Sequence, residues 1–160
     1  MRLLIAAVGR LKQGPERELF AHYLARAEAL GRKLALTPIA AIEIAESKVQ
    51  TAPERKAAEA AALLGKIPAG HKLICLDETG GALTSESFAR LIASYRDEGA
   101  QGLSFVIGGA DGLGADLLAK ADKVLSLGHM TLPHGLARIV LAEQIYRAAT
   151  ILAGHPYHRT

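Results

Sequence analysis

The sequence has little cysteine, few aromatic residues and no long apolar segment. Its one cysteine, Cys75, excludes an internal disulfide, and it lies in the apolar run Leu73–Leu76, where we expect a buried thiol in a reducing cytosol. The longest segment without a charged side chain, Val124–Ala137, falls short of the roughly 18 residues that span a membrane. The apolar run Leu3–Val8 is too short for a signal peptide. We therefore expect a soluble, cytoplasmic protein.

The scarcity of aromatic side chains also limits the kinds of binding surface. Four tyrosines, three phenylalanines and no tryptophan provide no platform for stacking several bases. The charge balance is mildly basic, with 19 Lys and Arg against 16 Asp and Glu and a net charge of +3, which permits a polyanionic partner without requiring one. Basic residues are concentrated near the N-terminus. Solvated helix faces or a binding surface would both explain this concentration. They are Arg2, Arg10, Lys12, Arg17, Arg26, Arg32 and Lys33.

Short apolar segments alternate with segments of helical periodicity along the whole chain, and 160 residues are the length of one domain. The pattern predicts an α/β fold with a mostly parallel sheet of five to six strands and helices on both faces, in a single domain over residues 1–160. The expected strands are Leu3–Val8, Leu34–Ile44 with an interruption at Pro38, Leu73–Leu76, Leu103–Ile107 and Val124–Leu127. The expected helices are Gly14–Gly31, Thr51–Gly65, Ser85–Gly99, Leu113–Ala121 and Pro133–Leu152.

Three loops follow the carboxyl ends of the last three strands, where ligands bind in such sheets. They are residues 76–80, 108–112 and 128–132. The glycines from Gly108 to Gly114 let backbone amides approach a ligand, but their spacing matches neither the dinucleotide fingerprint nor the P-loop. A tight turn would also explain these glycines. Many amides with few fixed charges suit a neutral ring or an adenosine better than a triphosphate.

The segment Gly128–Leu136, which joins the fifth strand to the last helix, contains two histidines, His129 and His134, that need an explanation. No cysteine or closely spaced carboxylate accompanies them, so a metal site is not expected. Thr131 could cap the last helix and Pro133 could occupy its first turn, which explains both residues structurally.

Four ordered motifs match a known family. They are Leu76–Gly81, Phe105–Gly112, Met130–His134 with Arg138, and His155–Arg159. With them the chain resembles, over all 160 residues, the RlmH (YbeA-like) 23S rRNA pseudouridine N3-methyltransferases of the SPOUT class. Departures from the family pattern occur at Gly81, Ala110, Asp111, Gly135 and Thr160.

The resemblance implies a trefoil knot in the C-terminal third of the chain, S-adenosylmethionine as the cofactor, and a homodimer. It implies methylation of N3 of a pseudouridine in 23S rRNA of the large subunit, in an assembled ribosome, without a metal or a membrane. The expected cofactor-binding residues are Leu76, Gly108, Gly109, Leu127, Gly128, His129, Met130, Thr131 and Leu132. The expected catalytic and substrate-binding residues are His134, Arg138, Tyr157, His158 and Arg159, with His158 as a possible proton acceptor and Arg159 as a partner for a deprotonated imide.

Two alternatives stay open at this point. The chain could be a non-catalytic α/β module that binds RNA or a nucleotide, or a SPOUT methyltransferase with another RNA substrate such as tRNA. Cofactor binding separates the first from an enzyme, and methyl transfer to defined RNAs separates the second. In a dimer we expect the last helix to bury Ile139, Val140 or Tyr146 against the partner.

Overall fold

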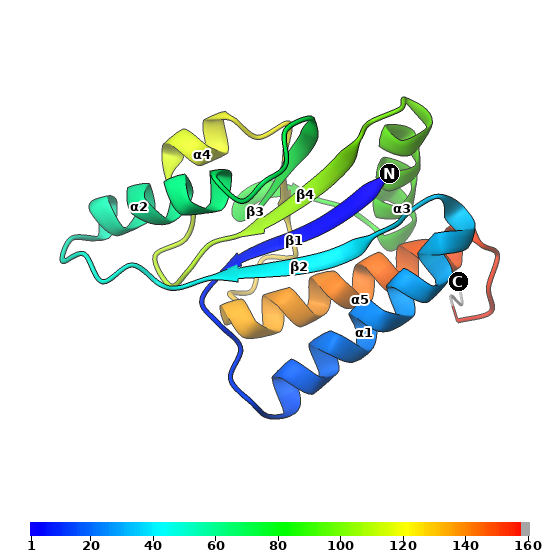
Figure 1. Cartoon of the computed structure of the whole chain (residues 1–160), viewed down its shortest axis with the longest axis horizontal. Coiled ribbons are helices and arrows are strands. Elements are labelled where there is room, and N and C mark those ends of the chain that lie inside the picture. The colour runs from blue at the N-terminus through cyan, green and yellow to red at the C-terminus, as the bar shows by residue number, and fades with distance from the viewer. Residues whose placement is uncertain (158–160) are drawn as a thin grey trace.

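A computed structural model describes residues 1–157 as a five-stranded, wholly parallel sheet with helices on both faces (Figure 1). The strand order is β2-β1-β4-β3-β5, so β1 and β4 lie in the middle of the sheet. This arrangement confirms the predicted fold class. The strands are β1 (Arg2–Val8), β2 (Ile39–Ile44), β3 (His71–Ala82), β4 (Gly102–Ile107) and β5 (Lys123–Ser126).

The helices divide between the two faces of the sheet. α1, α3 and α5 cover one face, and α1 and α5 run side by side below the sheet in Figure 1, while α2 and the short α4 lie above it. The bounds are α1 (Pro15–Gly31), α2 (Ala52–Leu64), α3 (Ser85–Asp97), α4 (Ala115–Ala119) and α5 (His134–Leu152), with a 3-10 turn, η1, at Arg32–Leu34. None of these helices is both long and apolar enough to cross a membrane.

Two separate cores follow from the alternation of side chains along the strands. In β1, Leu3 and Ile5 pack into the large core beneath α1, α3 and α5, whereas Ala6 and Val8 pack into the smaller core beneath α2 and α4. Because both faces are covered, the central strand β4 is buried along its whole length. This explains why the strands are continuous apolar runs in the sequence.

Strand β3 is longer than the sequence indicated. The strand was predicted to end at Leu76, but β3 continues to Ala82, and its pairing with β5 changes register between Leu76 and Gly81, which both pair with Leu125. A Cβ on Gly80 would lie 2.5 Å from the Leu125 carbonyl carbon, so this close crossing requires glycine.

Other boundaries also move. The second strand begins at Ile39, because Pro38 cannot donate a ladder hydrogen bond and the residues before it form η1. The fourth helix is confined to Ala115–Ala119. The trefoil knot implied by the resemblance stays a prediction.

Candidate active site

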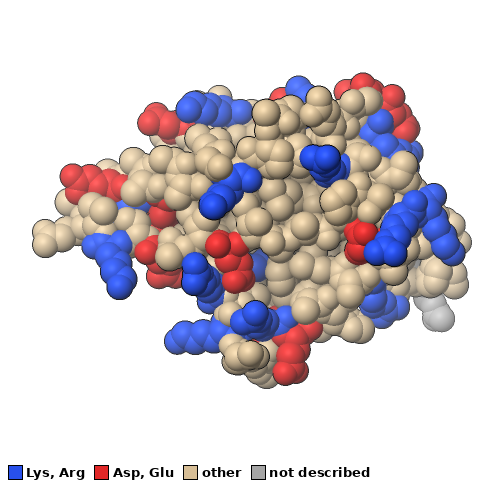
Figure 2. All heavy atoms as spheres, in the orientation of Figure 1, with Lys and Arg blue, Asp and Glu red and all other residues tan. Residues whose placement is uncertain are grey.

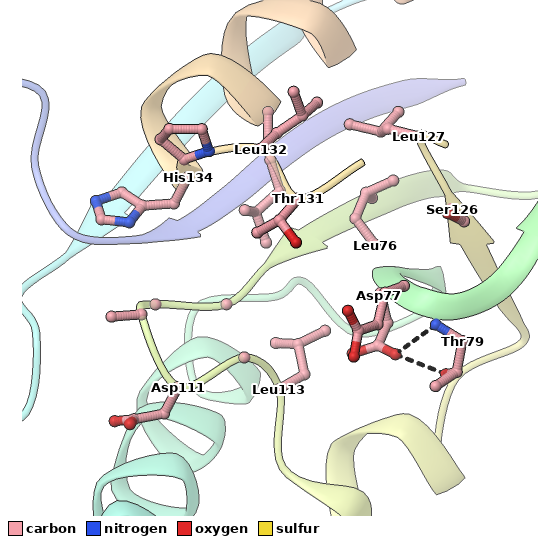
Figure 3. A pocket seen from close by; sticks show the side chains of 18 of the residues that line it. Leu76, Asp77, Thr79, Asp111, Leu113, Ser126, Leu127, Thr131, Leu132 and His134 are labelled. Atoms are coloured by element: carbon pink, nitrogen blue, oxygen red, sulfur yellow. Dashed lines mark hydrogen bonds between the residues drawn. The ribbon is translucent and has the colours of Figure 1, made fainter. Parts of the chain in front are cut away.

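A cavity of about 860 Å³ opens at the carboxyl ends of β3, β4 and β5, which is where the parallel sheet predicted a ligand. Its volume lies within the range of about 300–1,000 Å³ that small-molecule sites occupy. Figure 3 shows side chains from β3 and from the two following loops around one space. Eight of the nine predicted cofactor residues line it, namely Leu76, Gly108, Gly109, Leu127, Gly128, Met130, Thr131 and Leu132, whereas His129 lies on the third loop without lining the cavity.

The glycine loop after β4 forms a tight turn. The amide of Gly112 donates to the Gly109 carbonyl oxygen at 3.0 Å, and Gly112 has a φ of 78°, which favours glycine. A Cβ on Gly108 would lie 2.7 Å from the Gly112 carbonyl carbon, so the turn closes only over glycine. A Cβ on Gly109 would instead meet Val8 at 3.0 Å, so this glycine serves packing beneath the loop.

An ion pair attaches this loop to helix α2. Asp111 accepts two hydrogen bonds from Arg55, one from Nε at 2.7 Å and one from a terminal nitrogen at 3.2 Å. The Arg55 bond lowers the pKa of the Asp111 carboxyl. Arg55 also donates to the carbonyl oxygens of Val49 and Gln50, at 3.1 and 2.8 Å. The side chain therefore joins the glycine loop to the segment that precedes α2.

The loop between β5 and α5 forms another wall of the cavity. Gly128 has a φ of 136°, and its amide donates to the Ser126 hydroxyl at 3.2 Å. Met130 is 85% exposed and borders the opening. The expectation that Thr131 caps the last helix is wrong: Pro133 is at the N-cap, and no side chain there accepts a capping hydrogen bond.

Carboxylates accompany the leucines of the cavity. Asp77 accepts hydrogen bonds from the Thr79 amide at 3.0 Å and from the Thr79 hydroxyl at 2.6 Å, as Figure 3 shows. Asp77, Glu78 and Asp111 all line the space. The site therefore combines an apolar wall, the backbone of two glycine-containing loops and negative charge, which suits a ligand that carries an apolar ring and a cationic centre.

His134 begins α5 and lines the cavity. Its Nε2 lies 3.8 Å from Glu46 Oε1, and its side chain is 39% exposed. A Cβ on Gly9 would lie 3.4 Å from His134 Nε2, so the β1–α1 loop borders the histidine directly. His134 is thus available to a substrate that approaches the mouth of the cavity.

Arg138 does not face the cavity. It is 1% exposed, forms an ion pair with Glu43, and donates to the carbonyl oxygens of Val8 and Gly9 at 3.0 and 3.1 Å. Burial lowers the pKa of its guanidinium, which Glu43 opposes. Every one of these bonds is directed into the protein. The expected direct contact of Arg138 with substrate therefore disagrees with this geometry, and Arg138 is placed to position other residues.

Tyr157 lies far from the cavity in its own chain. Its ring packs on that of Tyr146, with centroids 4.7 Å apart, and its hydroxyl donates to Glu143 at 3.2 Å. The guanidinium of Arg147 lies 5.1 Å from the ring centroid. Burial raises the pKa of Tyr157 to about 12, so the phenol stays protonated at neutral pH. His158 and Arg159 lie outside the described residues.

Comparison with known proteins decides the family. A model described as "Predicted SPOUT methyltransferase" matches residues 1–158. The chain belongs to the SPOUT methyltransferase family. It is 56% identical over 159 residues to the ribosomal RNA large subunit methyltransferase H of Rhodopseudomonas palustris strain CGA009, covering 99% of each chain. Proteins of the same name from Methylobacterium sp. strain 4-46 and Xanthobacter autotrophicus are 53% and 54% identical, covering 99% of this chain and 98% and 99% of theirs.

The structure of this SPOUT methyltransferase adds residues that sequence reasoning missed. Asp77 and Asp111 were not predicted as site residues, although Asp77 directly follows the predicted strand Leu73–Leu76 and an acid at the end of a parallel strand is itself a signal of a site. Glu43 and Arg55 gave no such signal, because their partners Arg138 and Asp111 are 95 and 56 residues away. Within residues 1–157, no group of three His, Cys, Asp or Glu side chains is arranged to hold a metal ion.

Proposed function

We propose that this protein transfers a methyl group from S-adenosylmethionine to N3 of a pseudouridine in large-subunit 23S rRNA. The observation that carries the proposal is 56% identity, over 99% of both chains, to a protein named ribosomal RNA large subunit methyltransferase H. The cavity at the strand ends supports it, since it joins the three loops in which the cofactor was expected. A ribosomal substrate is consistent with a cytoplasmic protein.

The cavity fits the proposed cofactor in size and in chemistry. Leu76, Leu127 and Leu132 offer an apolar surface for an adenine ring, and the adjacent loops offer backbone amides. Asp77 and Glu78 supply negative charge for an ammonium or sulfonium group. The bound cofactor would supply a methyl group that is already activated. The protein therefore needs to orient the target base and to assist loss of the imide proton.

His134 is the described residue best placed to contact the target base. It lines the cavity at the mouth, and Glu46 lies 3.8 Å from its Nε2. Glu46 is suited to orient the imidazole, so that one ring nitrogen faces the base as an acceptor or donor. Arg138 contributes indirectly, by fixing the backbone of Val8 and Gly9 behind the histidine.

The geometry favours a tail that serves a second subunit. Tyr157 packs against Glu143 and Tyr146, and from His134 to Glu143 the helix rises about 14 Å. The residues of α5 that line the cavity, His134 and Ala137, lie at the start of the helix, whereas Tyr157 is held further along it. We therefore propose that His158 and Arg159 act at the cavity of a partner in a homodimer.

The surface of α1 and α5 supports such a dimer. The two helices run in the same direction, since Glu16 faces Gly135 at one end and Arg26 donates to the Tyr146 hydroxyl at 2.8 Å further along. Leu19 and Leu136 are 45% and 42% exposed on them. The residues expected at the interface need correction: Ile139 and Tyr146 are already buried within the chain, whereas Val140 is partly exposed. Sedimentation should give a dimer at micromolar concentration.

The decisive experiment is transfer of tritiated methyl groups to ribosomes that lack the modification, with free rRNA, large subunits and intact ribosomes compared. We expect tritium in the 23S rRNA of ribosomal particles, with the new methyl group on N3 of a pseudouridine. Calorimetric binding of S-adenosylmethionine without any transfer would indicate a non-catalytic binding module. Transfer to tRNA alone would assign another RNA substrate.

A further inference from the structure

Four exposed cations on the loop after β1, the first turn of α1 and the segment after β2 have no partner within residues 1–157. Arg10, Lys12, Arg17 and Lys48 are all exposed, and none of them forms a hydrogen bond or ion pair with another residue of 1–157. Many cations elsewhere are neutralised: Arg32 pairs with Glu28, Lys72 with Asp122, and Arg96 with Asp97. We call the group Arg10, Lys12, Arg17 and Lys48 the rim cations.

The rim cations are continuous with the cavity. A Cβ on Gly9 would lie 3.4 Å from His134 Nε2 and 3.1 Å from Glu46 Oε1, so the loops after β1 and β2 meet at the cavity-lining histidine. Arg10 follows Gly9, and Lys48 is two residues beyond Glu46. In Figure 2, Lys and Arg side chains gather at this end of the molecule, over the β1–α1 loop and the segment after β2.

The backbone that carries Arg10 and Lys12 is held rigidly from beneath. Arg138 donates to the Val8 and Gly9 carbonyl oxygens at 3.0 and 3.1 Å. Its ion-pair partner Glu43 accepts from the Leu11 amide at 3.1 Å. A buried, paired charge therefore holds the backbone at Val8, Gly9 and Leu11, from which the exposed Arg10 and Lys12 extend. A fixed loop loses little backbone entropy when its cations engage a ligand.

Two neighbouring acids lie against the start of α5. Glu16 faces Gly135, where its Oε2 would lie 2.7 Å from a Cβ on that glycine. Glu46 lies beside His134. Neither acid forms an ion pair with a rim cation within residues 1–157, so the rim cations remain available to a polyanion.

We infer that the rim cations bind the phosphate backbone of the substrate RNA on the His134 side of the cavity. This inference rests on the proposed function and adds the surface that docks the RNA. Phosphate contacts fix the position of a nucleic acid without reading its bases. The rim would thus place a flipped or looped-out base over the cavity, while the cavity itself holds the cofactor.

The test compares charge removal at the rim with the same change at the opposite edge of the sheet. Arg10→Ala, Lys12→Ala, Arg17→Ala and Lys48→Ala are made singly and combined. The control combines Lys33→Ala and Lys66→Ala, since both lysines are exposed and lie before strands rather than after them. Binding to ribosomal particles that lack the modification, and to the naked 23S rRNA, is measured over a series of salt concentrations.

Each rim variant should lower the slope of log affinity against log salt by about one, because one phosphate contact is lost. The combined variant should bind at least about 100-fold more weakly at physiological salt, with a raised KM for RNA and an unchanged kcat at saturation. Calorimetric affinity for S-adenosylmethionine, and the melting temperature, should match the unmodified protein. The Lys33 and Lys66 control should behave as the unmodified protein in every measurement.

Two results would overturn the inference. In the first, the unmodified protein methylates ribosomes, but the combined variant binds RNA with the same slope of log affinity against log salt. The other is a loss confined to intact particles with naked rRNA bound as before, which would assign the rim to a ribosomal protein. If the unmodified protein itself transfers no methyl group to ribosomes, the proposed function fails instead, so the two failures are distinguishable.

Discussion

Arg138 and Glu59 are buried charges on opposite faces of the sheet, and they are held in different ways. Arg138, on α5, is 1% exposed and has three partners, Glu43 and the carbonyl oxygens of Val8 and Gly9, while its buried Nε has no partner within residues 1–157. Glu59, on α2, is 6% exposed and accepts the Ser47 amide at 2.9 Å. Both reach from a helix toward the segments that follow the strands.

The two residues brace different parts of the cavity's surroundings. Arg138 fixes the loop after β1, which carries part of the rim. Glu59 fixes the segment after β2 and lies beneath the glycine loop, where its Oε2 would be 3.3 Å from a Cβ on Gly109. The active-site loops are therefore supported from both faces by single polar side chains. The support is stronger on the α5 side, because the buried charge there is compensated.

Replacing Arg138 should produce the largest effect. Arg138→Met leaves Glu43 without its counter-ion and two carbonyl oxygens without a donor, so we expect a loss of about 3 kcal/mol in the free energy of unfolding, measured by urea denaturation. Arg147→Met is the matched control on the same helix: the Arg147–Glu143 pair is part-exposed, and its removal should cost at most about 1 kcal/mol. Equal losses for the two variants would contradict a bracing role for Arg138.

Replacing Glu59 should lower the free energy of unfolding by less than replacing Arg138, and only when the substitution removes the oxygen that accepts the Ser47 amide. Glu59→Ala leaves the Ser47 amide without an acceptor and should cost about 1–3 kcal/mol in unfolding free energy. Glu59→Gln keeps a carbonyl oxygen at the same place and should cost less. If the Gln variant is as unstable as the Ala variant, the negative charge rather than the hydrogen bond supports this face.

The Arg55–Asp111 pair should affect ligand binding more than stability. Both side chains are more than a quarter exposed, so Asp111→Asn should change the unfolding free energy little. Because the pair attaches the glycine loop to α2, we expect the affinity for S-adenosylmethionine to fall at least about 3-fold by calorimetry. Asp97→Asn, in an exposed pair on α3, should leave that affinity unchanged. An unchanged affinity for Asp111→Asn would show that the loop holds itself.

The smallest effect at neutral pH concerns Cys75 in the small core. Burial raises the pKa of its thiol to about 11, so the protonated form is favoured in the folded state. Its contribution to stability is complete below the usual thiol pKa and is lost as the pH rises toward 11. At pH 8 a thiol reagent should modify the native protein at least about 100-fold more slowly than the urea-unfolded chain. Equal rates would mean that this core opens readily.

Much of the fold could be predicted from the sequence because it depends on local pattern. Leu3–Val8 is apolar throughout and Leu103–Ile107 has Ser104 as its one polar residue, a pattern typical of strands that are covered on both faces. The boundaries that failed depend on distant partners. The extension of β3 through Gly80 requires β5 to pass so closely that a Cβ on Gly80 would lie 2.5 Å from the Leu125 carbonyl carbon, and no pattern near Gly80 contains that information.

The candidate site divides in the same way. Glycines and strand ends located the cavity, since parallel strands bring their carboxyl ends together whatever the loops contain. The roles of polar side chains were not accessible, and Arg138 shows why. As a residue it is equally suited to bind phosphate or to pair inside a core, and its burial is decided by the packing of α5 against the sheet.

The sequence by itself determined the elements, their parallel pairing, the family and the edge of the sheet at which the cavity forms, because apolar periodicity and glycine positions act over a few residues. The tertiary structure alone decided which charges are exposed. It placed Arg10 and Lys48 in solvent beside the cavity, Arg138 beneath them, and Tyr157 on its own helix, away from the site. Burial and pairing are properties of neighbours in space, and for these residues the neighbours are far away in the chain.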